Sequence, residues 1–487
     1  MKYQAPGRHK DFDSFREHWQ RLAREIDGDF DAHPDPFGPE TLLASPFSLG
    51  DRTIGNRFCI HPMEGWDGSR LGLPSELTLR RWQRFGQSGA KLIWGGEAFA
   101  VRADGRANPN QLHRNSQADW RGALVTLRET LVTAHSDAGL ETDDLLCGLQ
   151  LTHSGRFARP DGRPAPRAAQ RNPVLDDRFA VRTSDDVVSD TELESIFTEY
   201  VEVAHAAHEA GFDFVDVKCC HGYLLHELLG AHSREGRYGG SYENRTRFVF
   251  DLIETISREL PDLRIGVRIS LADVFPHDAD ADGIGAPLSI ESHTPYHYGF
   301  GIHSDRPLSF RLDEPLRFLQ GLFERGVRLF NVSVGSPYYC PHLQRPATYP
   351  PSDGYQPPRD PLFEVFRHLE LTRACKQAFP EAAVVGSGYS YLQEWIPHVA
   401  LHELERGGVD FCGLGRMVLS YPELPRDVLA GGPLKRKLIC RTFSDCTTGP
   451  RHGLVSGCYP LDETYKNHPE ARELARIKRE RREEQRS

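Results

Sequence analysis

The sequence predicts an α/β protein whose core is a (β/α)8 TIM barrel. Two observations indicate this fold: the chain carries eight short apolar runs typical of strands, and most of them are followed by a helical pattern. Continuous apolar strands that alternate with amphipathic helices are typical of a parallel sheet, and eight such units can close a barrel. An open doubly wound sheet is the alternative, but no glycine-rich dinucleotide fingerprint follows the first strand.

The eight expected strands are spread over most of the chain. In order, they are residues 57–63, 91–101, 145–153, 212–220, 264–270, 327–335, 382–389 and 409–416. The clearest helix follows the third strand, where Ser189 and Glu192 can form a capping box. Apolar side chains then recur at helical spacing, at Ile196, Phe197, Tyr200, Val203, Ala204 and Ala207.

Two extensions and one insertion are expected around a barrel that spans residues 51–430. Residues 1–50 should form a short helix and a lid over the N-terminal end of the barrel. Residues 276–315 are too long for a simple βα loop, so we interpret them as an insertion near the active-site mouth. Residues 431–487 form a cysteine-containing extension with a charged tail, interpreted as a solvated helix end, with a specific binding element as the alternative.

Composition excludes several classes of protein. The 59 basic and 69 acidic residues give a net charge of -10, which argues against non-specific nucleic-acid binding. No stretch approaches the roughly 20 apolar residues of a membrane span, and the charged N-terminus lacks a signal sequence. Ten cysteines without a CxxC pair do not make a disulfide scaffold. We therefore expect a cytoplasmic protein that acts on a small molecule, with a homo-oligomer as one option for its assembly.

The end of the fourth strand is the most informative part of the chain. Its apolar residues stop at a polar cluster formed by Lys218, His221 and Tyr223, and a glycine-rich, charged stretch leads into the next helix. A strand that ends in titratable groups and is followed by a helix is how an α/β barrel displays an active site.

The runs KCCHGY and YGGSYENR in this segment resemble the old yellow enzyme family, in the branch of NADH:flavin oxidoreductases that includes 2,4-dienoyl-CoA and 2-enoate reductases. The resemblance covers about residues 40–430, and the motifs occur in the family's order at successive strand ends. It implies FMN as cofactor, NAD(P)H as electron donor and reduction of an activated C=C bond in an enoate, enone or enoyl thioester.

The resemblance also implies roles for the catalytic residues. His221 and the residue at position 218 would bind the carbonyl oxygen of the substrate, and Tyr223 would protonate its α-carbon. Lys218 replaces the usual histidine, and its full charge favours a carboxylate, a thioester or a developing enolate. A Schiff-base lysine is the alternative, but the flavin would occupy the space it needs.

The flavin ring would be held by residues at the first, second, third and fifth strand ends. The family places Pro62 and Met63 along the ring, Ala98 where the ring approaches the backbone, and Gln150 at the pyrimidine edge, which an amide suits because it donates and accepts. Arg268 would stabilise negative charge on the reduced ring, with a structural arginine as the alternative. Glu64 departs from the family's Thr or Cys, and could instead turn away to pair with an arginine.

The last two strand ends are expected to bind phosphate. Gly386, Ser387 and Gly388 follow the seventh strand, and Gly415 and Arg416 follow the eighth, which is where such barrels form a phosphate cradle. Glycines let backbone N–H groups approach the anion, and arginine adds a cation. His153 and Arg156 belong to the same motif as Gln150, with a structural role as the alternative.

The cysteines after the barrel bear on a second cofactor. Longer relatives bind a 4Fe-4S cluster with the spacing C-x2-C-x3-C-x11-C. Here Cys446 and Cys458 keep the last spacing, but Ile439 and Thr442 stand at the first two positions and Cys440 is out of register. Because four thiolates are the usual requirement, we expect no cluster. Two other functions stay open: an oxidative amine or N-demethylating flavoprotein, and a flavin-binding protein without turnover.

Overall fold

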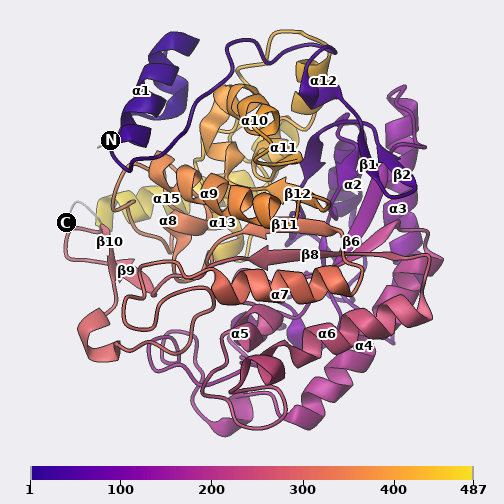
Figure 1. Cartoon of the computed structure of the whole chain (residues 1–487), viewed down its shortest axis with the longest axis vertical. Coiled ribbons are helices and arrows are strands. Elements are labelled where there is room, and N and C mark those ends of the chain that lie inside the picture. Colours follow the sequence, from indigo (N-terminus) through magenta and orange to yellow (C-terminus); the bar gives the residue numbers. More distant parts are fainter. Residues whose placement is uncertain (1–2, 485–487) are drawn as a thin grey trace.

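Eight parallel strands close into a barrel in the computed structural model, which describes residues 3–484 (Figure 1). They are β3 (Phe58–Ile60), β4 (Leu92–Ile93), β6 (Leu146–Thr152), β7 (Phe214–Val217), β8 (Arg264–Ser270), β11 (Leu329–Ser333), β12 (Ala383–Gly386) and β13 (Phe411–Leu414). Each strand pairs with the next, and β13 pairs with β3 to complete the ring. The short strand β5 (Ala98–Ala100) continues the second unit along β6. The predicted fold and all eight predicted strands are confirmed.

Helices cover the outside of the barrel, as the alternating pattern predicts. The longer ones are α2 (Glu76–Gly86), α3 (Trp120–Asp137), α4 (Asp190–Glu209), α6 (Tyr242–Glu259), α7 (Asp313–Glu324), α9 (Leu362–Ala378) and α10 (Ile396–Glu405). The expected capping box starts α4: Ser189 Oγ accepts a hydrogen bond from Glu192 N at 3.1 Å, and Glu192 Oε2 accepts one from Ser189 N at 3.3 Å. The apolar face of α4 is buried against the sheet, which explains its helical spacing.

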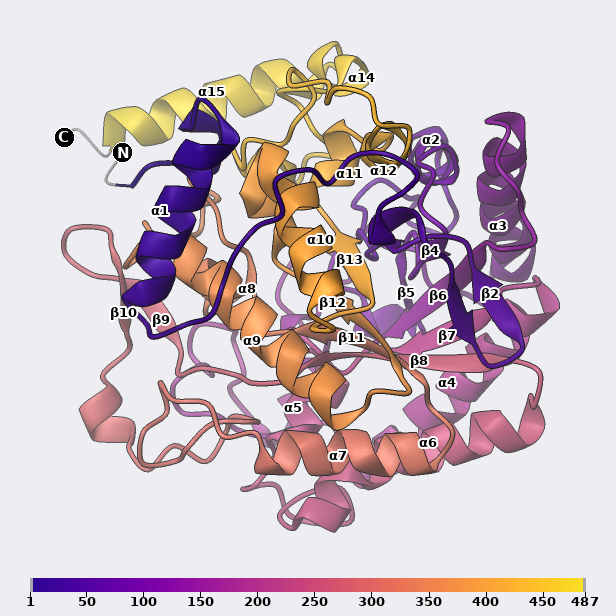
Figure 2. The same ribbon diagram turned by 45° about the horizontal axis from the view of Figure 1, so that its top comes forward.

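The N-terminal extension has two separate parts. A hairpin of β1 (Phe47–Leu49) and β2 (Arg52–Ile54) places Leu49 and Ile54 in one cluster with apolar residues of the barrel strands, so this hairpin covers one end of the barrel. The helix α1 (Phe12–Arg24) instead packs on α9, with the Trp19 and Phe366 rings 4.3 Å apart (Figure 2). The helix therefore supports the side of the barrel, and the covering segment extends past residue 50.

The long loop after β8 folds back on the loop after β11. It contains a hairpin of β9 (His277–Ala279) and β10 (Gly285–Pro287). His277 N donates to Tyr339 O at 2.8 Å, and Gly285 N donates to Gln356 O at 2.9 Å. These contacts join the two loops that follow neighbouring strands.

The C-terminal extension packs on the barrel through three helices: α13 (Asp445–Arg451), α14 (Glu463–Lys466) and α15 (Glu470–Glu484). Asp462 accepts hydrogen bonds from Arg80 and Arg84 of α2, and Lys478 of α15 donates to Asp445 of α13. The tail helix α15 is not wholly solvated, because Leu474 and Ile477 are buried. No helix between residues 3 and 484 combines the length and apolar character that a membrane crossing requires.

Candidate active site

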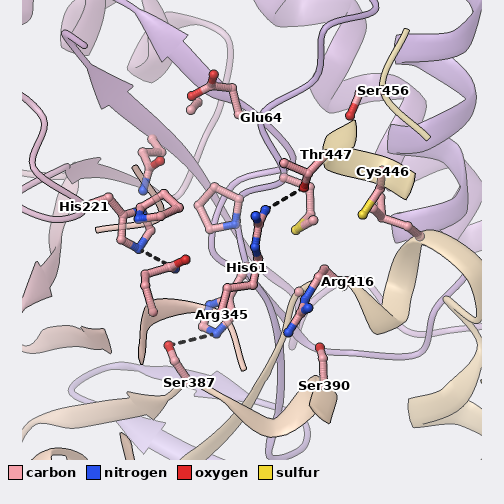
Figure 3. Close-up of a pocket in the computed structure, with 18 of the residues that line it drawn as sticks. His61, Glu64, His221, Arg345, Ser387, Ser390, Arg416, Cys446, Thr447 and Ser456 are labelled. Atoms are coloured by element: carbon pink, nitrogen blue, oxygen red, sulfur yellow. Dashed lines mark hydrogen bonds between the residues drawn. The ribbon is translucent and has the colours of Figure 1, made fainter. Parts of the chain in front are cut away.

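The predicted site residues surround one cavity of about 250 Å³ (Figure 3). Of the residues predicted to be catalytic or to hold the ring and the phosphate, its lining includes all except one: Pro62, Met63, Glu64, Ala98, Gln150, Lys218, His221, Tyr223, Arg268, Ser387, Gly388, Gly415 and Arg416. Gly386 is the exception. It is the last residue of β12, and a side chain there would contact Tyr389, so it supports the strand end rather than the cavity wall.

The turn after β7 is held in an unusual conformation. His221 has φ 66°, and Gly222 has φ 77°. A non-glycine residue in this left-handed region is uncommon and persists only where its surroundings fix it. Here His221 N donates to Ser270 Oγ at 3.0 Å, and Ser336 Oγ donates to His221 O at 2.7 Å. Two neighbouring strand ends thus hold the backbone that presents Lys218, His221 and Tyr223.

The His221 imidazole is half-buried and neutral. Its Nε2 lies 3.0 Å from Ser333 Oγ and 3.1 Å from the side-chain amide nitrogen of Gln344. Burial, with the charges of Arg268 and Lys218 as a smaller cause, lowers the pKa of His221 well below its usual value. The ring can therefore offer a hydrogen bond to a substrate without carrying a charge of its own.

Glu64 points into the cavity, where it meets Tyr223 and Lys218. The Tyr223 hydroxyl donates to Glu64 Oε2 at 2.9 Å and lies 3.0 Å from the Tyr338 hydroxyl. Lys218 Nζ is 3.9 Å from Glu64 Oε2 and 3.6 Å from the centre of the Tyr223 ring. The alternative in which Glu64 turns away to pair with an arginine is therefore wrong.

Burial shifts the titration of these groups in opposite directions. It lowers the pKa of Lys218, and the neighbouring Glu64 carboxylate partly offsets this shift. It raises the pKa of Tyr223 well above its usual value, and Glu64 raises it further. The Tyr223 hydroxyl therefore keeps its proton over the physiological pH range.

Gln150 and Arg268 form another wall of the cavity through Asp216. Gln150 Nε2 donates to Asp216 Oδ2 at 2.6 Å, and Arg268 N donates to Asp216 Oδ1 at 2.6 Å. This leaves the side-chain carbonyl oxygen of Gln150 to accept a hydrogen bond from a ligand. Arg268 Nε is buried and has no hydrogen-bond partner among residues 3–484. An acceptor and an unpaired cation on one wall fit the polar edge of a flavin ring.

The ends of β12 and β13 form an open cradle. Gly388 has φ 89°, and a Cβ there would come within 3.0 Å of the His368 ring, so only glycine fits without strain. A Cβ at Gly415 would meet nothing nearer than Met63 Sδ at 3.6 Å. Arg416 Nη2 donates to Pro346 O at 2.7 Å, and its buried Nη1 has no partner within residues 3–484. The unpaired guanidinium nitrogen fits an anion.

Several lining residues were missed by the sequence analysis. Tyr338, Gln344 and Arg345 lie in the loop after β11, and Cys446, Thr447, Pro450, Arg451 and Ser456 belong to the C-terminal extension. Inspection of the end of the sixth predicted strand for polar residues would have found the first group. In the second group, Cys446 keeps a family cysteine spacing, but no comparable signal marks the other residues.

His153 and Arg156 have structural surroundings and do not line this cavity. Arg156 Nη1 donates to Asp176 at 2.6 Å, and its Nε donates to Glu227 at 2.8 Å. His153 Nε2 lies 3.7 Å from Asp104. Arg156 joins the loop after β6 to the segment after β7, and His153 lies against the segment after β5, so both have the structural surroundings of their alternative interpretation.

The C-terminal cysteines are divided between the protein interior and the cavity. Cys440 and Cys458 are buried, whereas Cys446 lines the cavity. Thr442 Oγ1 accepts a hydrogen bond from Thr348 N at 3.0 Å, so that family cysteine position has a structural role here. Among residues 3–484, no group of three or more His, Cys, Asp or Glu side chains is arranged to hold a metal ion.

The chain is similar to known flavin oxidoreductases. The model of the NADH:flavin oxidoreductase / NADH oxidase family matches residues 42–286, about half of the chain. An NADPH dehydrogenase of Geobacillus sp. (strain WCH70) is 29% identical over 268 residues, which cover 53% of this chain and 68% of that protein. A putative 12-oxophytodienoate reductase-like protein of Arabidopsis thaliana is 25% identical over 348 residues, which cover 70% of this chain and 88% of that protein.

Among solved structures, a 2-naphthoyl-CoA reductase in complex with 2-naphthoyl-CoA resembles this chain with a TM-score of 0.63 and 16% identity. The match covers 88% of this chain and 57% of that one, so the chain spans little more than half the length of this neighbour. At 16% identity, this likeness shows that the two chains share a fold and nothing more.

Proposed function

Because the chain belongs to the NADH:flavin oxidoreductase / NADH oxidase family, which includes the old yellow enzymes, we propose that it reduces an activated C=C bond and that Tyr223 is the proton donor. The family makes the protein an FMN-dependent NAD(P)H oxidoreductase. The substrate class and the roles of single residues are the new part of the proposal.

The observation that carries the proposal is the placement of Tyr223 in one cavity with Lys218 and His221. A bound FMN would supply hydride transfer, with NAD(P)H as the source of the hydride and the β-carbon of the substrate as its acceptor. Lys218 and His221 hold the oxygen that conjugates with the double bond, and the Lys218 ammonium stabilises the negative charge that develops there. Tyr223 then gives its proton to the α-carbon, which is general acid catalysis.

The same cavity has the groups that FMN needs. Pro62, Met63 and Ala98 would lie along the ring, Gln150 would accept a hydrogen bond from its pyrimidine edge, and Arg268 would face its negative charge. The cradle of Ser387, Gly388, Gly415 and Arg416 would take the phosphate. The buried, unpaired nitrogens of Arg268 and Arg416 support this assignment of the FMN-binding site.

Lys218 also makes proton release by Tyr223 less costly. A tyrosinate beside the Glu64 carboxylate would be repelled, because two negative charges would lie at hydrogen-bond distance. The ammonium over the Tyr223 ring offsets that repulsion. A cationic site of this kind favours enoates and enoyl thioesters over neutral enones.

A half-reaction experiment tests the proposal. The purified protein is reduced anaerobically with NADH or with NADPH. Enones, enoates and enoyl thioesters are then added separately, and reoxidation of the flavin is followed by its absorbance. A sample without added acceptor is the control. Reoxidation by at least one alkene with formation of the saturated product supports ene reduction. A flavin that is bleached by nicotinamide but not reoxidised by any alkene contradicts it.

A further inference from the structure

A second arginine lies beside Arg416 at the cradle, although no motif singles it out. Arg345 follows β11, and its Nη1 donates to Thr447 Oγ1 at 2.5 Å (Figure 3). Arg416 follows β13, and its Nη2 donates to the carbonyl oxygen of Pro346, the residue after Arg345. The Arg416 side chain is thus bonded to the backbone next to Arg345, and both arginines line the same cavity.

Both guanidinium groups keep a buried nitrogen without a partner. Arg345 Nη2 and Arg416 Nη1 donate to no hydrogen-bond acceptor among residues 3–484, although both residues line the cavity. Burial lowers the pKa of Arg345 to about 10, and the charge of Arg416 contributes to that shift. Two neighbouring cations that each keep a buried nitrogen without an acceptor are costly unless an anion binds between them.

We infer that Arg345 and Arg416 together bind the phosphate group of FMN, and that Thr447 of the C-terminal extension positions Arg345. This inference rests on the FMN-binding site of the proposed function. A phosphate carries up to two negative charges and can accept hydrogen bonds from both guanidinium groups at once. The backbone of Ser387, Gly388 and Gly415 borders the same part of the cavity and can supply further N–H donors.

The consequence is that the C-terminal extension belongs to the cofactor site. Thr447 lies in α13, which is fastened to the tail helix α15 by the hydrogen bonds from Lys478 to Asp445 at 2.7 and 2.9 Å. Cys446 of α13 also lines the cavity. Retention of FMN should therefore depend on a segment that lies outside the barrel.

Comparison of FMN with riboflavin tests the inference, because riboflavin has the same ring and no phosphate. Dissociation constants of both flavins are measured by fluorescence with deflavinated wild type, Arg345→Ala and Thr447→Val. Arg345→Ala should weaken FMN about 10- to 100-fold, the usual loss for a charge-assisted hydrogen bond, and leave riboflavin unchanged. Thr447→Val should weaken FMN about fivefold, as expected for one neutral hydrogen bond.

Two further variants make the test decisive. Arg325→Ala, at a half-buried arginine that pairs with Glu254 and does not line the cavity, should keep the wild-type ratio of the two constants. If Arg345→Ala does not bind riboflavin and so is not folded, Arg345→Gln replaces it. A wild-type ratio of FMN to riboflavin affinity in the folded Arg345 variant overturns the inference. The measurement needs no substrate, so it can fail while alkene reduction is still observed.

Discussion

The Tyr223 hydroxyl donates a hydrogen bond to Glu64 Oε2 at 2.9 Å, so the proposed proton donor is bonded to a carboxylate that arrives from a different strand end. The Lys218 ammonium lies within 4 Å of both the carboxylate and the ring of Tyr223. These three groups form one electrostatic unit. A change at Glu64 should therefore change the titration of Lys218 and of Tyr223.

Glu64→Gln should shift the titration of Lys218 to lower pH. Burial lowers the pKa of Lys218, and the Glu64 carboxylate opposes that shift, so loss of the carboxylate lowers the pKa further. A saturated carboxylate analogue of the substrate stays ionised over this range and reports the charge of Lys218. The pH at which it ceases to bind should fall by about one unit in the variant. The exposed Glu254→Gln is the control, and an unchanged midpoint in Glu64→Gln would show that Glu64 and Lys218 are not coupled.

Lys218→Ala should discriminate between classes of alkene. Loss of the ammonium removes a charge-assisted contact worth about 1.5–3 kcal/mol for an anionic oxygen and less for a neutral carbonyl. The kcat/KM for enoates should therefore fall at least tenfold more than the value for neutral enones. Steady-state kinetics with one member of each class, matched in carbon skeleton, makes the comparison, and equal losses would remove Lys218 from substrate selection.

Much of this site was predictable from sequence because a barrel collects the ends of its strands at one face. Lys218 follows the apolar run of β7, and Gln150 and Arg268 lie near the carboxyl ends of β6 and β8, so their meeting follows from the fold. The direction of Glu64 was not predictable. Its partner Tyr223 is 159 residues away along the chain and reaches it only after β7 takes its place in the ring.

The contribution of the C-terminal extension was also beyond sequence reasoning. Thr447 and Arg451 follow the last strand, and nothing in their spacing indicates that the chain returns to the cavity. Arg345 illustrates a different omission, because it follows a predicted strand but matches no family motif. Inspection for polar residues would have found it, but its unpaired Nη2 and its place beside Arg416 are visible only in the folded chain.

Asp273 should make the folded state less stable as pH rises. Burial raises its pKa to about 7, although Val274 N and the Tyr339 hydroxyl both donate to it. A carboxyl whose pKa is higher in the folded state favours folding at low pH, and this contribution is lost between about pH 4 and pH 7. Asp273→Asn removes this dependence. The free energy of unfolding of the variant relative to wild type should increase by about 2–3 kcal/mol from pH 5 to pH 8.

Chemical denaturation of the two proteins at both pH values measures this difference. Asp278→Asn, a half-exposed carboxylate in the same loop, is the control and should show no comparable change. A variant that gains no stability relative to wild type on going to pH 8 would mean that Asp273 is not forced to ionise in the folded protein.

Protein purified under anaerobic conditions should contain no stoichiometric iron or acid-labile sulfide. Two of the four cysteine positions of the cluster-binding relatives are Ile439 and Thr442, and Thr442 is engaged with Thr348. Elemental analysis and a sulfide assay on the same sample check this expectation. Roughly four irons per chain, the content of one [4Fe–4S] cluster, would overturn it and direct attention to Cys440, Cys446 and Cys458.

The central claim is that Tyr223 supplies the proton for alkene reduction, and stopped-flow measurement of the two half-reactions of Tyr223→Phe tests it most directly. Reduction by NAD(P)H needs no proton from Tyr223, so its rate should stay within a few-fold of wild type. Reoxidation by the alkene should slow by about 10²- to 10⁴-fold, the usual effect of a lost general acid. Reoxidation at the wild-type rate with every alkene tested would contradict the account.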